Sequence, residues 1–109
     1  MSNDFSYEIE REAAGIVIYL RGEIDKVTAE RLRDAIEPHM GPRQTIVLDL
    51  AGVRFMDSSC LTVLVQARGA LTADEGSLLL RNPSSIAHRV LTVGGLQELL
   101  QADADDDRD

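Results

Sequence analysis

The sequence has few of the features that mark membrane, secreted or nucleic-acid-binding proteins. It has no tryptophan, one cysteine and no apolar run long enough to span a bilayer. Lys and Arg total 11 against 19 Asp and Glu, which gives a formal net charge of −8. Because nucleic acids and anionic membranes select clustered basic residues, we expect neither as a direct partner. The N-terminus lacks the basic and apolar regions of a secretory signal, which predicts a cytoplasmic protein.

The sequence is also poor in residues that hold metals or perform catalysis. Cys60 cannot form an internal disulfide, and its distance along the chain from His39 and His88 gives no metal-ligand spacing. Neither a glycine-rich phosphate loop followed by Lys nor a serine with a neighbouring histidine and acid is evident. We therefore predict no metal, no cofactor and no enzymatic activity.

A length of 109 residues suits one domain with a single core. We assign residues 1–102 to this domain. Residues 103–109 carry five aspartates, so we expect them to form a solvated, disordered acidic tail.

The order of elements predicts an α/β fold. Apolar and β-branched runs predict strands over residues 5–11, 15–21, 45–50 and 77–81. Helices are expected from Asp25 or Thr28 to Met40, over 58–71, from the turn and cap at residues 82–84 to near Gly94-Gly95, and over 96–101. The first helix should turn one apolar stripe inward, formed by Ala29, Leu32, Ala35 and Ile36. This order predicts a mixed β-sheet of four to five strands covered by three to four helices.

The most informative segment is the junction between the third strand and the following helix. Asp57, Ser58 and Ser59 stand there, and each side chain can accept a hydrogen bond from a free N–H of the first helical turn. The simpler interpretation is a helix cap. The second is a switch, because a helix start carries partial positive charge and unpaired donors that would tolerate a phosphate on Ser58 or Ser59. Such a phosphate adds roughly two negative charges beside Asp57.

The residues that flank this junction have two interpretations each. Phe55 and Met56 are expected to pack in the core or at an interface. Cys60 could be a redox sensor, because a thiol at a helix start can have a lowered pKa. We favour the other interpretation, a small packed apolar residue, because free cysteines are usually buried.

Two motifs together resemble the STAS-domain anti-sigma factor antagonists. The first is the segment 46–61, with its Val-Leu-Asp-Leu strand and its Phe-Met-Asp-Ser-Ser turn. The second is the segment 20–25 with residues 28–32 after it, which resembles the family's Gly-Glu-hydrophobic-Asp turn and first helix. The resemblance covers about residues 5–100, and two motifs in the right order are more specific than either alone.

The resemblance implies a single STAS-like domain and a regulatory role. Family members bind an anti-sigma factor that has serine kinase activity, which releases a sigma factor, and phosphorylation of the antagonist abolishes the binding. Carried over by position, the phosphoacceptor is Ser58, with Ser59 the less favoured site. The implied partner-binding residues are Asp25, Asp57, Ser58, Ser59, Cys60 and Leu61. ATP and Mg²⁺ would belong to the kinase, and a phosphatase would reverse the modification.

The sequence departs from the family pattern in two places. Cys60 stands where the family usually has Gly, which would narrow kinase access to the acceptor. The chain also ends sooner after Leu100 than in many relatives. An alternative function is that of a STAS interaction subunit in a transporter or stress-signalling complex, in which the same helix face binds a partner without a sigma factor.

Overall fold

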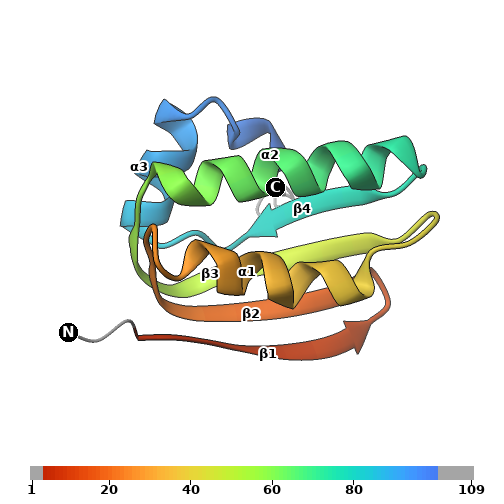
Figure 1. Cartoon of the computed structure of the whole chain (residues 1–109), viewed down its shortest axis with the longest axis horizontal. Helices are drawn as coiled ribbons and strands as arrows, with labels where there is room; N and C mark the ends of the chain where they lie inside the picture. Colours follow the sequence, from red (N-terminus) through yellow and green to blue (C-terminus); the bar gives the residue numbers. More distant parts are fainter. Residues whose placement is uncertain (1–3, 101–109) are drawn as a thin grey trace, which may run out of the picture.

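The computed structural model describes residues 4–100, in which a hairpin of two strands is followed by alternating helices and strands (Figure 1). The strands are β1 (Phe5–Glu12), β2 (Gly15–Ile24), β3 (Thr45–Met56) and β4 (Ser77–Arg81). The helices are α1 (Ala29–Ile36), α2 (Ser58–Ala73) and α3 (Ser85–Val93), with 3-10 turns η1 (Glu37–His39) and η2 (Gln97–Leu99). The predicted acidic tail, residues 103–109, lies outside the described residues.

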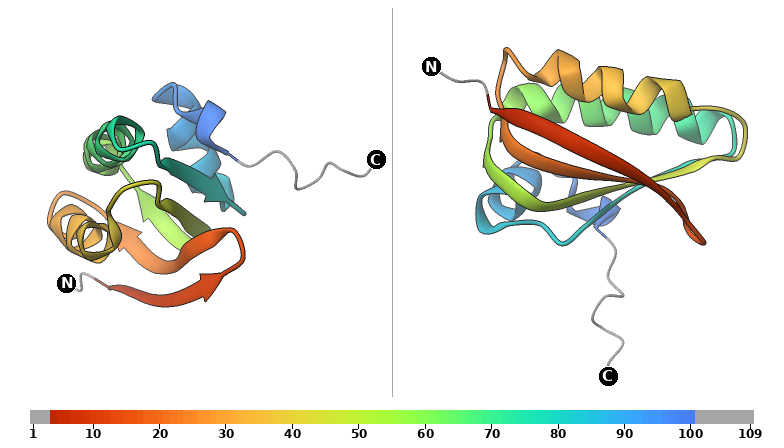
Figure 2. Two further views of the ribbon diagram at one scale, coloured as in Figure 1. Left: turned by 90° about the vertical axis from the view of Figure 1, so that its right-hand side faces the viewer. Right: turned by 90° about the horizontal axis from the view of Figure 1, so that it is seen from below.

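The four strands form one mixed sheet in the order β1-β2-β3-β4. β1 pairs with β2 in an antiparallel hairpin, whereas β2, β3 and β4 run parallel. Figure 2 shows α1 and α2 on one face of the sheet and α3 on its other side, at the β4 end. The predicted α/β class with a mixed sheet is confirmed. Parallel strands bring their carboxyl ends to one edge, and the helix starts follow there.

The core lies between the sheet and the helices. Alternate residues of the strands face α1 and α2, so that Ile18 of β2, Leu48 of β3 and Leu80 of β4 are fully buried. The predicted stripe of α1 is confirmed, because all four of its residues are buried. Burying one such aliphatic side chain contributes about 1.5–3 kcal/mol. This packing holds the strand ends, and therefore the loops beyond them, in fixed positions.

β1 ends one residue later than predicted, at Glu12, and two other strands extend further. β2 continues to Ile24 instead of residue 21, and β3 to Met56 instead of residue 50. The pairing of β2 with β3 continues through register shifts beside Gly22 and Gly52. Gly22 has a φ of +100°, and a Cβ at Gly52 would lie 2.9 Å from a backbone oxygen of β2. These bulges extend the ladder through polar sequence, which ordinary strand patterns do not anticipate.

Three helices differ from the predicted ranges. α1 ends at Ile36 instead of Met40, and η1 follows it, since Pro38 lacks the N–H that an α-helical ladder needs. α2 runs on to Ala73, two residues past its predicted end. The final helix expected over 96–101 is the short turn η2, and residue 101 lies outside the described part of the chain.

A buried carboxylate fixes the turn between β4 and α3. Asp49 of β3 accepts hydrogen bonds from Arg81 Nε at 3.1 Å, Asn82 Nδ2 at 2.9 Å and the Ala51 N–H at 3.1 Å. Asn82 has a φ of +52°, a conformation that Asn tolerates better than most residues. Asp49 therefore holds the segment that leads into α3.

Candidate functional site

The carboxyl ends of β2 and β3 lie next to each other at one edge of the sheet. Ile24 and Met56 are paired in the ladder, and the Asp57 N–H donates to the Ile24 carbonyl oxygen at 3.1 Å. Asp25 and Asp57 follow directly. The two strand-to-helix junctions are consequently neighbours, at the left-hand end of the molecule in Figure 1.

At the β3–α2 junction, Asp57 is the N-cap of α2. Its carboxylate accepts the Ser59 N–H at 2.8 Å, and its carbonyl oxygen accepts the Cys60 N–H at 3.1 Å. Ser58 is exposed and Ser59 half-buried. Asp57 therefore already accepts two N–H groups of the first helical turn. A phosphate on Ser58 would stand beside the negative charge of Asp57.

At the β2–α1 junction, Asp25 and Thr28 bond each other reciprocally. The Asp25 carboxylate accepts the N–H groups of Val27 and Thr28, both at 2.9 Å. The Thr28 hydroxyl accepts the Asp25 N–H at 2.9 Å and donates to the Glu23 carbonyl oxygen at 2.8 Å. These hydrogen bonds hold the pKa of Asp25 below its ordinary value. The Thr28 N–H has the largest effect, and the Thr28 hydroxyl and the Val27 N–H add to it. Asp25 therefore orders its own loop, and its side chain is half-buried.

The structure separates Cys60 from the other predicted site residues. Its side chain is 1% exposed and belongs to the hydrophobic core. Burial, together with the charge of Asp57, raises the pKa of the thiol to about 12. The redox-sensor interpretation, which needs a lowered pKa, is thus wrong. Cys60 cannot reach a partner with its side chain, and its role is packing beneath the junction.

Leu61 connects the junction to α3. It is half-buried and packs against the core. A Cβ added at Gly94, which follows α3, would lie 2.5 Å from Leu61 Cδ1, so the Leu61 side chain fills the space that Gly94 leaves. The carboxyl end of α3 therefore lies beside the first turn of α2.

Sequence reasoning missed two features of this end of the molecule. Arg54 forms an ion pair with Asp4 at 2.8 Å and a longer one with Glu23 at 3.7 Å, which ties the start of β1 to the ends of β2 and β3. Phe55, expected in the core or at an interface, is 44% exposed and so lies outside the core, whereas Met56 is buried. The bulges place Phe55 outward, and no sequence pattern carries that information.

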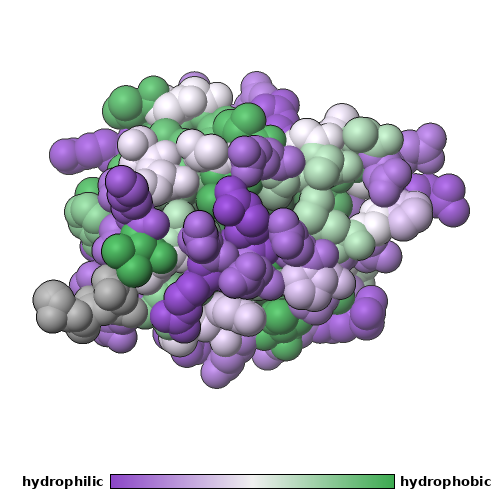
Figure 3. Space-filling model, in the orientation of Figure 1, coloured by the Kyte–Doolittle hydropathy of each residue, from purple (hydrophilic) through white to green (hydrophobic). Residues whose placement is uncertain are grey.

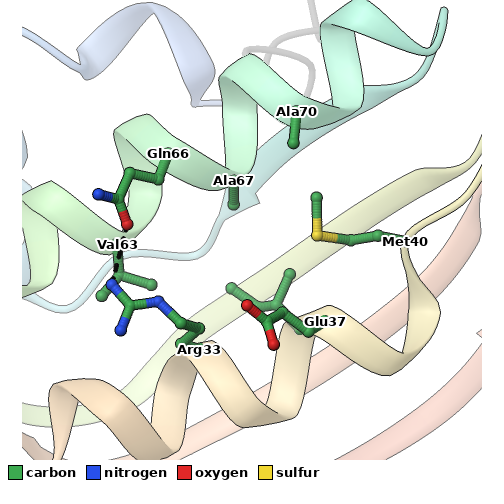
Figure 4. Close-up of a pocket in the computed structure, with 8 residues that line it drawn as sticks. Arg33, Glu37, Met40, Val63, Gln66, Ala67 and Ala70 are labelled. Atoms are coloured by element: carbon green, nitrogen blue, oxygen red, sulfur yellow. Dashed lines mark hydrogen bonds between the residues drawn. The ribbon is translucent and has the colours of Figure 1, made fainter.

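A small cavity lies between α1 and α2, away from the junctions (Figure 4). Its volume is about 100 Å³, well below the roughly 300–1,000 Å³ of ordinary ligand sites. Arg33 donates to Gln66 Oε1 at 2.9 Å across its mouth. The lining residues are Arg33, Ile36, Glu37, Met40, Val63, Gln66, Ala67 and Ala70. None of the predicted site residues lines it.

Residues 4–100 contain neither a metal-ligand cluster nor a membrane-spanning helix. Within this range, His, Cys, Asp and Glu side chains form no group of three that could hold a metal ion. The helices there are too short or too polar to cross a bilayer.

The fold and the paired junctions define a small α/β domain with two neighbouring helix starts at one edge of its sheet. Residues 7–101 match the family model described as "Mlab, STAS domain", and the chain belongs to the STAS domain family. The predicted family membership is confirmed.

Curated relatives of the chain are anti-sigma factor antagonists. The chain is 35% identical over 101 residues to the anti-sigma-B factor antagonist of Listeria monocytogenes, covering 90% of this chain and 88% of the relative. It is 28% identical over 95 residues to the anti-sigma F factor antagonist of Paenibacillus polymyxa, covering 85% and 81%.

Solved structures give the same relationship. The unphosphorylated form of the anti-sigma factor antagonist SpoIIAA has a TM-score of 0.76 at 28% identity, with coverage of 94% of this chain and 95% of SpoIIAA. An anti-sigma factor antagonist from Mycobacterium paratuberculosis has a TM-score of 0.82 at 26% identity, with coverage of 97% and 92%. SpoIIAA is also known in a phosphorylated form, with a TM-score of 0.66 at 26% identity and coverage of 94% and 98%.

Proposed function

We propose that this chain is a cytoplasmic anti-sigma factor antagonist that binds a serine-kinase-type anti-sigma factor and releases a sigma factor. The observation that carries the proposal is the exposed Ser58 at the first turn of α2, with Asp57 capping the helix beside it. The names of the relatives, and the two forms of SpoIIAA, support a protein of this class with a phosphorylation switch. The chain itself acts as ligand and substrate, not as an enzyme.

The proposed switch is electrostatic. Asp57 already uses the Ser59 N–H, so the phosphate of phosphorylated Ser58 would gain little compensation from the helix start. It would add about two negative charges to a junction that already holds Asp25 and Asp57. A partner that docks over Ser58 would have to remove water from this dianion, at a cost of several kcal/mol. Since about 1.4 kcal/mol changes affinity tenfold, we expect a loss of about a hundredfold or more.

The proposed partner surface consists of Asp25, Asp57, Ser58, Ser59 and Leu61. Cys60 is omitted because its side chain is buried. Ser58 is the preferred acceptor over Ser59, because Ser58 is exposed whereas Ser59 is half-buried. A phosphatase that reverses the modification completes the proposal.

The test is incubation of the purified chain with candidate kinase-type anti-sigma factors and Mg²⁺-ATP, followed by mass spectrometry and binding measurements. We expect phosphate on Ser58. Ser58→Ala should bind like the unmodified chain and resist modification, whereas Ser58→Asp should bind weakly. Equal binding by all three proteins would reject the electrostatic switch.

The alternative function is an interaction subunit of a transporter or stress-signalling complex. It would use the same end of the domain without a sigma factor. Affinity purification from the native cell extract separates the two: recovery of a transporter ATPase, with no kinase-type anti-sigma factor, would favour the alternative.

A further inference from the structure

The first strand, β1, leaves one edge of the sheet open. It is the outer strand in the order β1-β2-β3-β4, and it pairs with β2 over its whole length in one continuous register. At the opposite edge, Leu100 forms a parallel bridge with Leu80 of β4. Proteins usually protect an open edge with charged side chains, a proline, a bulge or a cover. Because β1 contains no proline and its pairing has no bulge, its charged side chains are the protection that it has.

The ladder fixes which main-chain groups of β1 point outward. The Glu23 N–H donates to the Asp4 carbonyl oxygen at 2.8 Å, in line with the register of the hairpin. In an antiparallel ladder, hydrogen-bonded pairs alternate with pairs that do not bond each other. The even-numbered residues of β1 therefore bond β2, whereas the N–H and C=O groups of Tyr7, Ile9 and Arg11 point away from it. Such a row of outward groups can pair with a further strand.

The side chains of β1 divide between the two faces of the sheet. Tyr7 and Ile9 lie on the face that carries α1, because their partners in the ladder belong to the core, and each is 38% exposed. Glu8, Glu10 and Glu12 lie on the opposite face. Along the lower edge of the molecule, where β1 runs in Figure 1, Figure 3 shows hydrophilic side chains with hydrophobic ones among them. The open edge thus has an apolar face and an acidic face.

The acidic face is only partly neutralised by residues 4–100. A Glu12 carboxylate oxygen lies 3.6 Å from a guanidinium nitrogen of Arg81, and Glu8 forms a longer, exposed pair with Arg21 at 3.8 Å. Exposed pairs of this kind contribute little. Glu10, in the middle of the row, takes part in no ion pair within the described residues. The centre of the edge therefore keeps its negative charge.

This charge discriminates between the strands that could add to the edge. A second copy, paired antiparallel through its own β1 with like faces aligned, would bring its glutamates against those of the first. Like charges opposite each other destabilise a ladder. A strand that alternates basic and apolar residues instead places Lys or Arg against the glutamates and apolar side chains beside Tyr7 and Ile9. The formal net charge of −8 also repels a second copy and attracts a basic segment.

We propose that β1 is a second binding surface, which accepts a basic, extended segment of a partner protein as an additional strand of the sheet. The segment alternates Lys or Arg with apolar residues. Its main-chain hydrogen bonds to the outward groups of β1 supply affinity, and its alternate side chains supply specificity. The inference is independent of the proposed function, because Ser58 takes no part in it.

The test is binding of the full chain to a synthetic peptide as long as β1 in which Lys and Val alternate. A peptide in which Glu and Val alternate is its control. Amide hydrogen exchange measured by NMR locates the bound peptide: it should slow the exchange of the outward N–H groups of Tyr7, Ile9 and Arg11. The even-numbered N–H groups of β1, which already bond β2, should change little. Added salt should weaken the binding, because the charges that attract the peptide are exposed.

Two variants separate the contribution of charge from that of the main chain. Glu10→Lys should weaken binding of the Lys-Val peptide about tenfold, because an attraction across the ladder becomes a repulsion. Ile9→Pro removes one outward N–H and should weaken binding about fivefold, while the pairing of β1 with β2 is retained. Glu75→Lys is the matched control, since it makes the same change of charge in the loop before β4, at the opposite edge of the sheet. Thermal unfolding checks that each variant is folded.

Equal binding of the Lys-Val and Glu-Val peptides, or an equal loss in Glu10→Lys and Glu75→Lys, overturns the proposal. Unchanged exchange at Tyr7, Ile9 and Arg11 with saturating peptide also overturns it. Sedimentation equilibrium examines the other occupant: a dimer of the full chain that Ile9→Pro dissociates would assign the edge to a second copy. These results leave the proposed function untouched, because they do not involve phosphorylation or the Ser58 junction.

Discussion

The two strand-to-helix junctions follow the same local plan but differ in the exposure of their hydroxyl. Each has an aspartate at the strand end that accepts N–H groups at the helix start, and each has a hydroxyl residue within three positions of it. Thr28 is completely buried and bonds both Asp25 and Glu23, whereas Ser58 is exposed. The comparison teaches that a hydroxyl beside a capping acid is not by itself accessible to a modifying enzyme. Accessibility of the oxygen is what distinguishes the two junctions.

The largest expected effect is on phosphate incorporation. Ser58→Ala should abolish modification by the kinase-type anti-sigma factor, because it removes the exposed oxygen. Thr28→Val should leave the phosphate content per folded molecule unchanged, since a buried hydroxyl cannot enter a kinase site. Intact-mass spectrometry of both variants measures this. Loss of phosphate in folded Thr28→Val, with retention in Ser58→Ala, would reverse the assignment of the two junctions.

The next effect is on stability, where Thr28→Val should cause the larger loss and Ser58→Ala the smaller. Thr28→Val leaves the Asp25 N–H and the Glu23 carbonyl oxygen without their buried partner, at a cost of about 1–3 kcal/mol. Ser58→Ala should change the free energy of unfolding by about 0.5 kcal/mol or less, as is usual for exposed positions. Urea unfolding measures both. The prediction fails if the two variants lose equal stability.

A smaller effect concerns the cap of α2. Asp57→Ala removes the acceptor of the Ser59 N–H and should destabilise the domain by about 1 kcal/mol. Asp57→Asn keeps an oxygen acceptor and serves as the control, with a smaller loss. The free energies of unfolding of the two variants decide the matter, and a loss in Asp57→Asn as large as that in Asp57→Ala would point to the charge and not to the hydrogen bond.

The smallest effect is the pH dependence at the other junction. The N–H groups and hydroxyl around Asp25 lower the pKa of its carboxyl in the folded state. Its ionisation therefore stabilises the fold above the unfolded pKa of about 3.9, and this contribution is lost as the pH falls through the lower folded value. Relative to Asp25→Asn, the parent chain should have a constant advantage in unfolding free energy at neutral pH that shrinks below about pH 4. An advantage that grows on acidification would contradict this.

Much of the fold could be predicted from residue patterns. Residue patterns identified every strand and each of the three α-helices within residues 4–100. Examples are the alternation in β1, the 3.6-residue periodicity of α1 and the apolar run of β3. Their ends were less predictable. β2 and β3 extend through Gly22 and Gly52 because bulges keep the ladder paired, and such pairing depends on the neighbouring strand rather than on local sequence.

The capping role of Asp57 could be predicted from the sequence, but the exposure of the residues around it could not. The role of Asp57 as the N-cap of α2 follows from the ordinary preference for Asp at a helix start. The burial of Cys60 and Thr28, and the exposure of Ser58, Phe55 and Val93, depend on which elements cover each junction. Contacts such as Leu61 with Gly94 join segments more than thirty residues apart, and one sequence carries no signal for them.

The central claim is that a phosphate on one exposed serine controls docking. Its most direct test is the dissociation constant of the full chain for its kinase-type anti-sigma factor, measured with Ser58 unmodified and with Ser58 stoichiometrically phosphorylated. We predict that binding by the phosphorylated chain is weaker by about a hundredfold or more, with the fold unchanged by circular dichroism. Equal dissociation constants for the two forms would contradict the claim.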